Sequence, residues 1–247
     1  MISIDLNCDL GEGMLYDEQL MPLISSANIA CGYHAGDTDT IKKTAELCLK
    51  YNVAIGAHPG FADKENFGRK ELHLSSDRYY ELVTEQLEII HKIVGSLGAT
   101  LHHVKPHGAL YNMAAKDKAL ATVIAKAVKD FNASLVLYGL SGSYSITEAE
   151  VIGLKTASEV FADRTYQPDG KLTPRSSNNA LINSEQQALH QVLQMITQQT
   201  VTAVNDLTIT IKADTVCIHG DGEHAVDFAK LIHHSLKQND IVITSIK

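Results

Sequence analysis

The chain has 247 residues, of which 45% are hydrophobic and 20% charged, and this composition excludes a disordered protein and favours a globular one with a sizeable core. The formal net charge of −8 comes without a basic stripe, which argues against nucleic acid as a partner. No apolar run approaches the ~18 residues of a membrane span, and the N-terminus lacks a signal-peptide pattern, so we expect a cytoplasmic protein without a membrane partner. The four cysteines lack a C-x-x-C pair, which argues against a disulfide framework.

Short β-rich segments alternate with helix-length periodic segments along the chain, the pattern of an α/β protein with a mainly parallel sheet. We expect strands at residues 2–7, 24–30, 53–57, 100–105, 134–138, 154–160 and 216–219. We expect helices at residues 37–51, 76–97, 117–131 and 223–236, with Asp37 as N-cap of the first and Ser76 as N-cap of the second.

Two long segments, residues 60–75 and 163–183, interrupt the alternation and are rich in Gly, Pro, Arg and Asn. Long ordered loops in compact domains are more often functional than not. No internal repeat or other shift in composition marks a boundary, so we expect a single domain over residues 1–247.

Polar side chains gather at the C-terminal ends of the expected strands, where barrel and open-sheet enzymes build their sites. On the first strand, a period of two places Asp5, Asn7 and Asp9 on one face, and Glu12 follows between two glycines. The alternative is an exposed edge strand with a solvated face. We favour a functional site.

The next two strands carry further candidates. Asn28 shares a face of the second strand with Ser26, and His34 lies in the turn that follows among small residues that leave room for a ligand. The third strand ends at His58, just before a Pro-Gly pair. A single histidine would usually be structural, but this one has polar neighbours at the adjacent strand ends.

The fourth strand places His103, Lys105 and His107 on one parity. A buried lysine is costly unless it is paired, so one interpretation of Lys105 is a structural ion pair, with Glu159 as the candidate partner. The other is substrate anchoring or stabilisation of an oxyanion, which we favour.

The later strands add carboxylates and an imidazole. Glu159 and Asp163 share a parity at the end of the sixth strand, and His219 and Asp221 share one at the end of the seventh. Asp221 either orients an imidazole or caps the next helix. Asp9, His58 and His107 are candidate ligands of a divalent cation, although their spacing is not diagnostic. No Walker-type phosphate loop, dinucleotide fingerprint or G-x-S-x-G motif is present.

The chain resembles the LamB/YcsF family over residues 5–236. The resemblance lies in several motifs in one order: DLNCDLGEG (5–13), SANIACG (26–32), HAGD (34–37), GAHPG (56–60), FGR (67–69), VKPHGALYN (104–112), EVFADR (159–164) and HGD (219–221). Departures from the family pattern are small, and they include Phe61-Ala62 before Asp63 and Lys70 after Arg69.

The resemblance implies an irregular (β/α) barrel of about seven parallel strands, of the glycoside hydrolase/deacetylase superfamily type. It also implies ATP-dependent opening of 5-oxo-L-proline to L-glutamate, with ADP and phosphate as products, by a protein that works in one complex with two partners, subunits B and C. ATP would then be a co-substrate handled largely by the partners, in keeping with the missing phosphate loop.

Two sets of site residues follow as expectations. The catalytic candidates are Asp9, Glu12, His58, Lys105, His107 and Glu159. Lys105 with His58 or His107 would stabilise the developing oxyanion, and a carboxylate of Asp9, Glu12 or Glu159 would act as base for water. The substrate-binding candidates are Asn7, Asn28, His34, Asp63, Asp163, Arg164, His219 and Asp221. The alternatives are a metal-dependent deacetylase or amide hydrolase on the same barrel, and a non-catalytic subunit that only binds the lactam.

Overall fold

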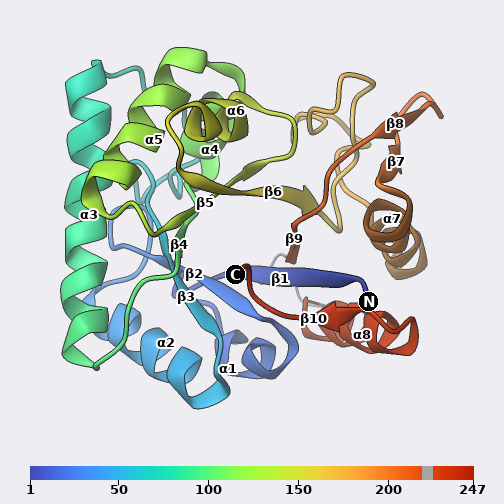
Figure 1. Cartoon of the computed structure of the whole chain (residues 1–247), viewed down its shortest axis with the longest axis horizontal. Helices are drawn as coiled ribbons and strands as arrows, with labels where there is room; N and C mark the ends of the chain where they lie inside the picture. Colours follow the sequence, from blue (N-terminus) through green and yellow to red (C-terminus); the bar gives the residue numbers. More distant parts are fainter. Residues whose placement is uncertain (219–224) are drawn as a thin grey trace.

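The computed structural model describes residues 1–218 and 225–247, and in these ranges seven parallel strands close into a barrel (Figure 1). In chain order the strands are β1 (Ser3–Leu10), β2 (Ser26–Ala30), β3 (Ala54–His58), β4 (His103–Val104), β5 (Val136–Leu140), β6 (Lys155–Phe161) and β9 (Thr215–Ile218). The ring has no open edge because β1 pairs with both β2 and β9. The expected seven-stranded (β/α) barrel is confirmed.

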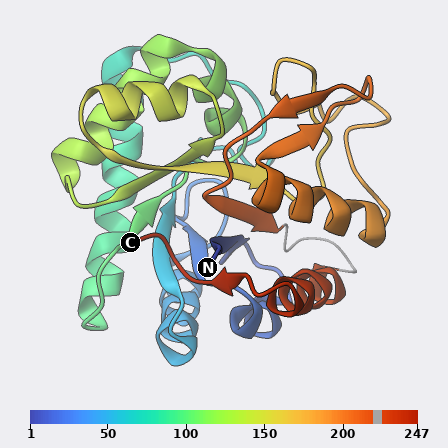
Figure 2. The ribbon, with the colours of Figure 1, turned by 45° about the vertical axis from the view of Figure 1, so that its right-hand side comes forward.

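Helices surround the barrel (Figure 1): α2 (Thr38–Tyr51), α3 (Ser76–Ser96), α4 (Gly108–Lys116), α5 (Lys118–Phe131), α6 (Tyr144–Val151), α7 (Glu185–Gln198) and α8 (Ala225–Gln238). The short helices α1 (Asp17–Leu20) and η1 (Met21–Leu23) follow β1. An antiparallel hairpin of β7 (Thr200–Thr202) and β8 (Thr208–Thr210) lies beside α7 (Figure 2), and β10 (Val242–Ile243) pairs with the start of β1. Within the described ranges, no helix has the length and apolar character needed to cross a membrane.

The seven barrel strands match the sequence-based expectations in number and place, with one marked difference in length, whereas β7, β8 and β10 were not predicted. The fourth strand is only His103–Val104, although the amides of His102 and Lys105 still donate to the carbonyls of Ile55 and Ala57 on β3. The amide of His107 also donates, to the carbonyl of Pro59, so hydrogen bonding to the β3 side continues past Pro106, which itself has no N–H.

One of the two expected helix N-caps is confirmed, and the other lies one residue earlier than expected. Asp37 caps α2 as expected by accepting a hydrogen bond from the amide of Thr40. The cap of α3 is Ser75, not Ser76, because the Ser75 hydroxyl accepts from the amide of Arg78.

Helices α4, α6 and α7 were not predicted, and α4 is buried over most of its length, so it shows no amphipathic stripe.

The barrel interior is filled by layers of polar side chains, where aliphatic residues are usual. The alternation predicted for β1 is confirmed, since Leu6, Cys8 and Leu10 pack in the hydrophobic core while the residues of opposite parity point inward. From the bottom of the barrel upward, the layers are Asp5 with Ser26, Tyr138 and Thr215, then Asn7 with Asn28 and His103, then Asp9 with His58, Lys105 and Glu159. The top layer is the floor of the site.

Candidate active site

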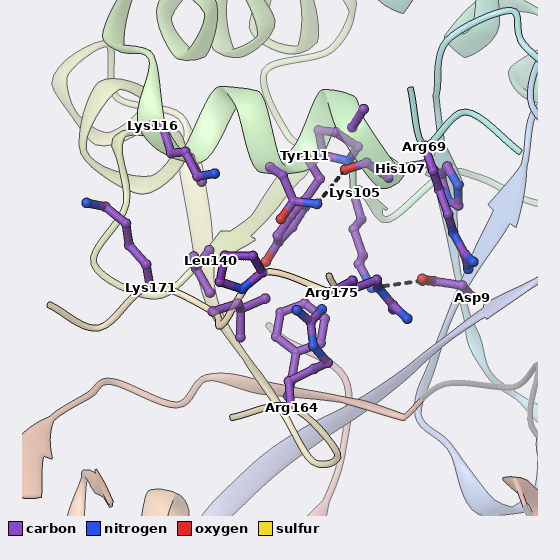
Figure 3. A pocket seen from close by; sticks show the side chains of 18 of the residues that line it. Asp9, Arg69, Lys105, His107, Tyr111, Lys116, Leu140, Arg164, Lys171 and Arg175 are labelled. Carbon is purple, nitrogen blue, oxygen red and sulfur yellow. Dashed lines mark hydrogen bonds and ion pairs between the residues drawn. The ribbon is translucent and has the colours of Figure 1, made fainter. Parts of the chain in front are cut away.

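A cavity of about 270 Å³ lies above this top layer, at the carboxyl ends of the strands (Figure 3). The catalytic candidates Asp9, Glu12, His58, Lys105 and His107 all line it. The remaining walls come from α4 and from the two long loops, residues 60–75 and 163–183, which the sequence marked as functional. The strand ends therefore supply the floor and the loops supply the rim.

Lys105 is the central cation of the floor and is 2% exposed. Its Nζ lies 2.8 Å from Asp9 Oδ1 and 2.9 Å from Glu159 Oε1, so the ion pair with Glu159 that the sequence suggested is present. Nζ also lies 3.3 Å from Asn7 Oδ1 and 3.2 Å from Cys217 Sγ. Burial opposes the charge, but Asp9 and Glu159 hold the pKa of Lys105 well above its ordinary value. An ammonium group has three hydrogens, and the hydrogen bonds to Asp9, Asn7 and Cys217 use them all, while Glu159 lies beside the ammonium as an ion pair.

Asp9 connects the lysine to the histidines. Its Oδ1 accepts hydrogen bonds from Lys105 and from Asn28 Nδ2, each at 2.8 Å, and its Oδ2 lies 3.4 Å from His58 Nε2. Burial raises the pKa of Asp9, but the charges and hydrogen bonds of His58 and Lys105 outweigh it and hold that pKa well below the usual range. A carboxylate held so firmly in its ionised form is a weak base.

Three buried imidazoles converge on the carboxylate of Glu12. Its Oε1 lies 3.3 Å from His34 Nε2, 3.4 Å from His107 Nδ1 and 3.8 Å from His58 Nε2. The rings of His34 and His107 are stacked, with centroids 3.8 Å apart. Burial, aided by the charge of His58, lowers the pKa of His34 to about 3 and that of His107 to about 2. Both of these rings are neutral at physiological pH.

Hydrogen bonds to backbone carbonyls fix two of the tautomers. His58 Nδ1 lies 2.7 Å from the carbonyl of Lys105, and His107 Nε2 lies 2.9 Å from the carbonyl of Phe67. A carbonyl only accepts, so both nitrogens carry hydrogen. In the neutral ring of His107 the other nitrogen, Nδ1, then carries a lone pair and has no N–H to offer the cavity. The expected role as a donor to an oxyanion therefore does not fit His107, and it stays a prediction for His58.

Two glycines of the first long loop make room for the stacked rings. A Cβ at Gly60 would lie 2.7 Å from His34 Nδ1, and a Cβ at Gly68, where φ is +62°, would lie 2.8 Å from His34 Cβ. Both distances are too short for a side chain, so close approach of the loop to the histidines depends on glycine at these positions.

Cations surround the mouth of the cavity: Arg69, Lys116, Arg164, Lys171 and Arg175. Figure 3 shows Lys116 and Lys171 at the end of the cavity away from Asp9. Arg164, an expected binding residue, is 5% exposed and donates to the carbonyls of Thr173 and Ala180, and burial lowers its pKa. The other four were not predicted as site residues, because strand parity places strand residues and not those of loops or of an unpredicted helix.

Several expected substrate-binding residues lie away from the cavity surface. Asn7 and Asn28 are fully buried beneath it, where Asn28 Nδ2 donates to both Asn7 Oδ1 and Asp9 Oδ1. They position the floor and do not line the cavity. His34 also lies behind the lining, stacked on His107, and Glu159 lies behind Lys105.

Both aspartates of the long loops accept hydrogen bonds within their own loops. The carboxylate of Asp63 accepts hydrogen bonds from Asn66, and the carbonyl of Asp163 accepts from the amide of Ile182. Neither is among the lining residues. His219 and Asp221 lie outside the described residues.

The fold and the site together define a (β/α) barrel with ionisable groups gathered at the carboxyl ends of its strands, the arrangement on which barrel enzymes build their active sites. The chain belongs to the LamB/YcsF family, whose model matches residues 4–247. It is 52% identical to a protein from Tolumonas auensis that is named as a 5-oxoprolinase subunit, in an alignment that covers 100% of both chains.

Solved structures agree with this assignment. The lactam utilization protein from Thermus thermophilus is 37% identical, with a TM-score of 0.94 over 99% of this chain and 100% of that chain. A family 4 carbohydrate esterase from Streptomyces lividans is 11% identical, with a TM-score of 0.51 over 99% of this chain and 93% of that chain. At this identity the esterase shows a shared fold and nothing more.

Proposed function

We propose that this chain is the barrel subunit of an ATP-dependent 5-oxoprolinase. The reaction is the opening of 5-oxo-L-proline to L-glutamate with formation of ADP and phosphate, and two partner subunits take part. The observation that carries the proposal is the cavity itself, which combines an anionic and imidazole floor with a cationic mouth. Full-length relatives named for this activity support it.

The charges of the cavity suit the chemistry of this substrate. A five-membered lactam with a carboxylate is small enough for a cavity of about 270 Å³, and its carboxylate would face the arginines and lysines of the mouth. A lactam is a stable amide, so ATP would activate its carbonyl as a phosphorylated species. The extra negative charge would be favoured by the same cations.

The contacts sharpen the roles expected from the sequence. Lys105 is fully engaged by its acceptors, so we assign it to holding Asp9 and Glu159 in place, and not to direct contact with the oxyanion. Glu12 lines the cavity and is the better candidate base for water, because the pKa of Asp9 is held well below its usual range. ATP binding is assigned mostly to the partners.

The test is reconstitution of the complex. The purified chain is mixed with its two partner subunits, ATP and 5-oxoproline, and glutamate and phosphate are measured. We expect glutamate only when all components are present, and a loss of at least ~100-fold in kcat for Glu12→Gln. Glu18→Gln is the matched control, since Glu18 is exposed and pairs with Lys50. Absence of glutamate from the complete wild-type mixture would refute the proposal.

A further inference from the structure

We infer that Glu12, His34, His58 and His107 form a binding centre for a divalent transition metal of the zinc, cobalt, nickel or iron class. This inference stands on the geometry of the four side chains and does not depend on the proposed ring-opening activity. Glu12 is the proposed base of the site without an ion, and with an ion bound it would serve as a ligand instead. It revises the sequence-based candidate set of Asp9, His58 and His107, because Glu12 and His34 take the place of Asp9.

The separations of the four ligand atoms match a metal centre. One atom from each residue lies within 4.8 Å of all the others. Glu12 Oε1 is 3.3, 3.4 and 3.8 Å from the nitrogens of His34, His107 and His58. Ligand atoms at the corners of a tetrahedron, with bonds of about 2.1 Å, lie roughly 3.4 Å apart. Little movement is needed to close the four atoms around an ion.

The nitrogens that face one another in the cluster are those that the backbone leaves available. His58 Nε2 and His107 Nδ1 are 2.9 Å apart, and the other nitrogen of each ring already donates to a backbone carbonyl. The carboxylate of Glu12 adds negative charge beside them. A cation held between these atoms is attracted by the carboxylate and accepts the lone pair of each deprotonated nitrogen.

The surroundings of the rings are those of metal-binding histidines. Such histidines usually donate their second nitrogen to a carbonyl or carboxylate, which fixes the tautomer, and His58 and His107 do so. His34 Nδ1 has no hydrogen-bond partner among the residues that the structure describes, so nothing there prevents His34 Nε2 from carrying the lone pair. The three rings are only 1 to 5% exposed, so water competes little for them.

Asp9 is excluded from the ligand set by its other bonds. Its Oδ1 is held by Lys105 and Asn28, and only Oδ2 faces His58 Nε2, at 3.4 Å. Three imidazole nitrogens and one carboxylate oxygen favour zinc, cobalt, nickel or iron over magnesium or calcium, which prefer all-oxygen sites. A proton shared between His58 and His107 is the competing occupant, and the experiment distinguishes the two.

The test measures metal binding on the whole chain without ATP, substrate or partner subunits. The protein is stripped with a chelator, dialysed against Zn²⁺ or Co²⁺, and analysed for metal content, and the visible absorption of the Co²⁺ form reports nitrogen coordination. We expect ~1 equivalent of tightly bound metal and a d–d spectrum. Wild-type protein that retains less than ~0.1 equivalent of either ion, or that binds only Mg²⁺, would overturn the inference.

Three variants assign the ligands. His58→Gln and His107→Asn replace each ring with a smaller amide, and Glu12→Gln removes the anionic ligand at the cavity surface. We expect each to weaken metal affinity by ~100-fold or more, because even changes beyond the direct ligands cost 10–100-fold. His190→Gln, an exposed position on α7, is the control and should bind as wild type. Circular dichroism confirms the fold of each variant, and unchanged affinity in all three would contradict the assignment.

Discussion

At the scale of single residues, the barrel interior shows how buried charge is tolerated. Asp5 is 1% exposed, and its carboxylate accepts four hydroxyl hydrogen bonds: from Ser25 at 2.6 Å, Ser26 at 2.7 Å, Thr215 at 2.6 Å and Tyr138 at 3.0 Å. Burial raises the pKa of Asp5, and these four bonds oppose the shift. The carboxylate thus serves as the common acceptor that joins β1, β2, β5 and β9.

We predict that Asp5→Asn lowers the free energy of unfolding by about 1–3 kcal/mol, because an amide offers one acceptor oxygen where the carboxylate offers two and leaves a buried hydroxyl without its partner. Urea unfolding at pH 7 measures the change. Asp39→Asn, an exposed substitution on α2, should stay within about 0.5 kcal/mol of wild type. Equal stability of Asp5→Asn and wild type would show that the hydroxyls find other acceptors.

At the scale of elements, glycine sets how closely β3 and β4 pack. A Cβ at Gly56 would lie 2.1 Å from His103 Nε2. The His103 ring cannot easily retreat, since it stacks on Tyr138 with centroids 4.2 Å apart and is hydrogen-bonded to Asn28 Oδ1 at 2.8 Å. The His103 ring therefore fits into its polar layer only because the neighbouring residue on β3, Gly56, has no side chain.

We predict that Gly56→Ala destabilises the protein by about 3 kcal/mol or more, because the methyl group overlaps a ring held on two sides. Gly95→Ala is the matched control: Gly95 lies inside α3 and nothing would contact its added Cβ, so this variant should be more stable by about 0.5–1 kcal/mol. Thermal and urea unfolding of the two variants should shift in opposite directions. A shift in the same direction would mean that His103 moves freely.

The elements also show how far sequence reasoning reaches. A period of two on β1 correctly placed Asp5, Asn7 and Asp9 inside the barrel, and strand ends correctly placed His58 and Lys105 at the site, because a strand fixes the direction of every side chain. A loop has no such period, so the positions of Arg69 and Arg175 at the cavity were not predictable. Strand alternation shows which face a side chain is on, but not how deep in the barrel it lies. Asn28 was therefore expected to bind substrate, although it is buried beneath the cavity surface.

At the scale of the whole molecule, the sign of the charge at the cavity mouth opposes that of the chain. The net charge is −8, yet five basic side chains, Arg69, Lys116, Arg164, Lys171 and Arg175, line the cavity mouth, and among the described residues Glu71 is the one acidic side chain that lines the cavity outside its floor. An anionic substrate is repelled by the molecule as a whole and attracted near the mouth. Such local fields raise the concentration of a charged ligand at its site and weaken as salt is added.

We predict that Lys116→Glu raises KM of the reconstituted complex for 5-oxoproline roughly fourfold at low salt, as expected for reversing a unit charge about 10 Å from an anion in water. The value of kcat should change little, since Lys116 is exposed at the mouth and away from the floor. Lys42→Glu makes the same charge change on exposed α2 and should leave KM unaltered. Half-molar salt should abolish the difference, and an increase in KM that persists there would point to direct contact.

Closure of the barrel through β1 and β9 has a consequence for how the protein forms. Asp5 and Thr215, which the closing ladder sets side by side, are 210 residues apart in the chain. A ribosome must therefore deliver most of the polypeptide before the first strand meets its second neighbour, and until then one edge of β1 stays unpaired. Aggregation competes with folding most strongly in that interval, when an exposed strand edge is available to other chains. The exposure of this strand edge during synthesis is thus a property of the ring itself, whatever chemistry its upper end performs.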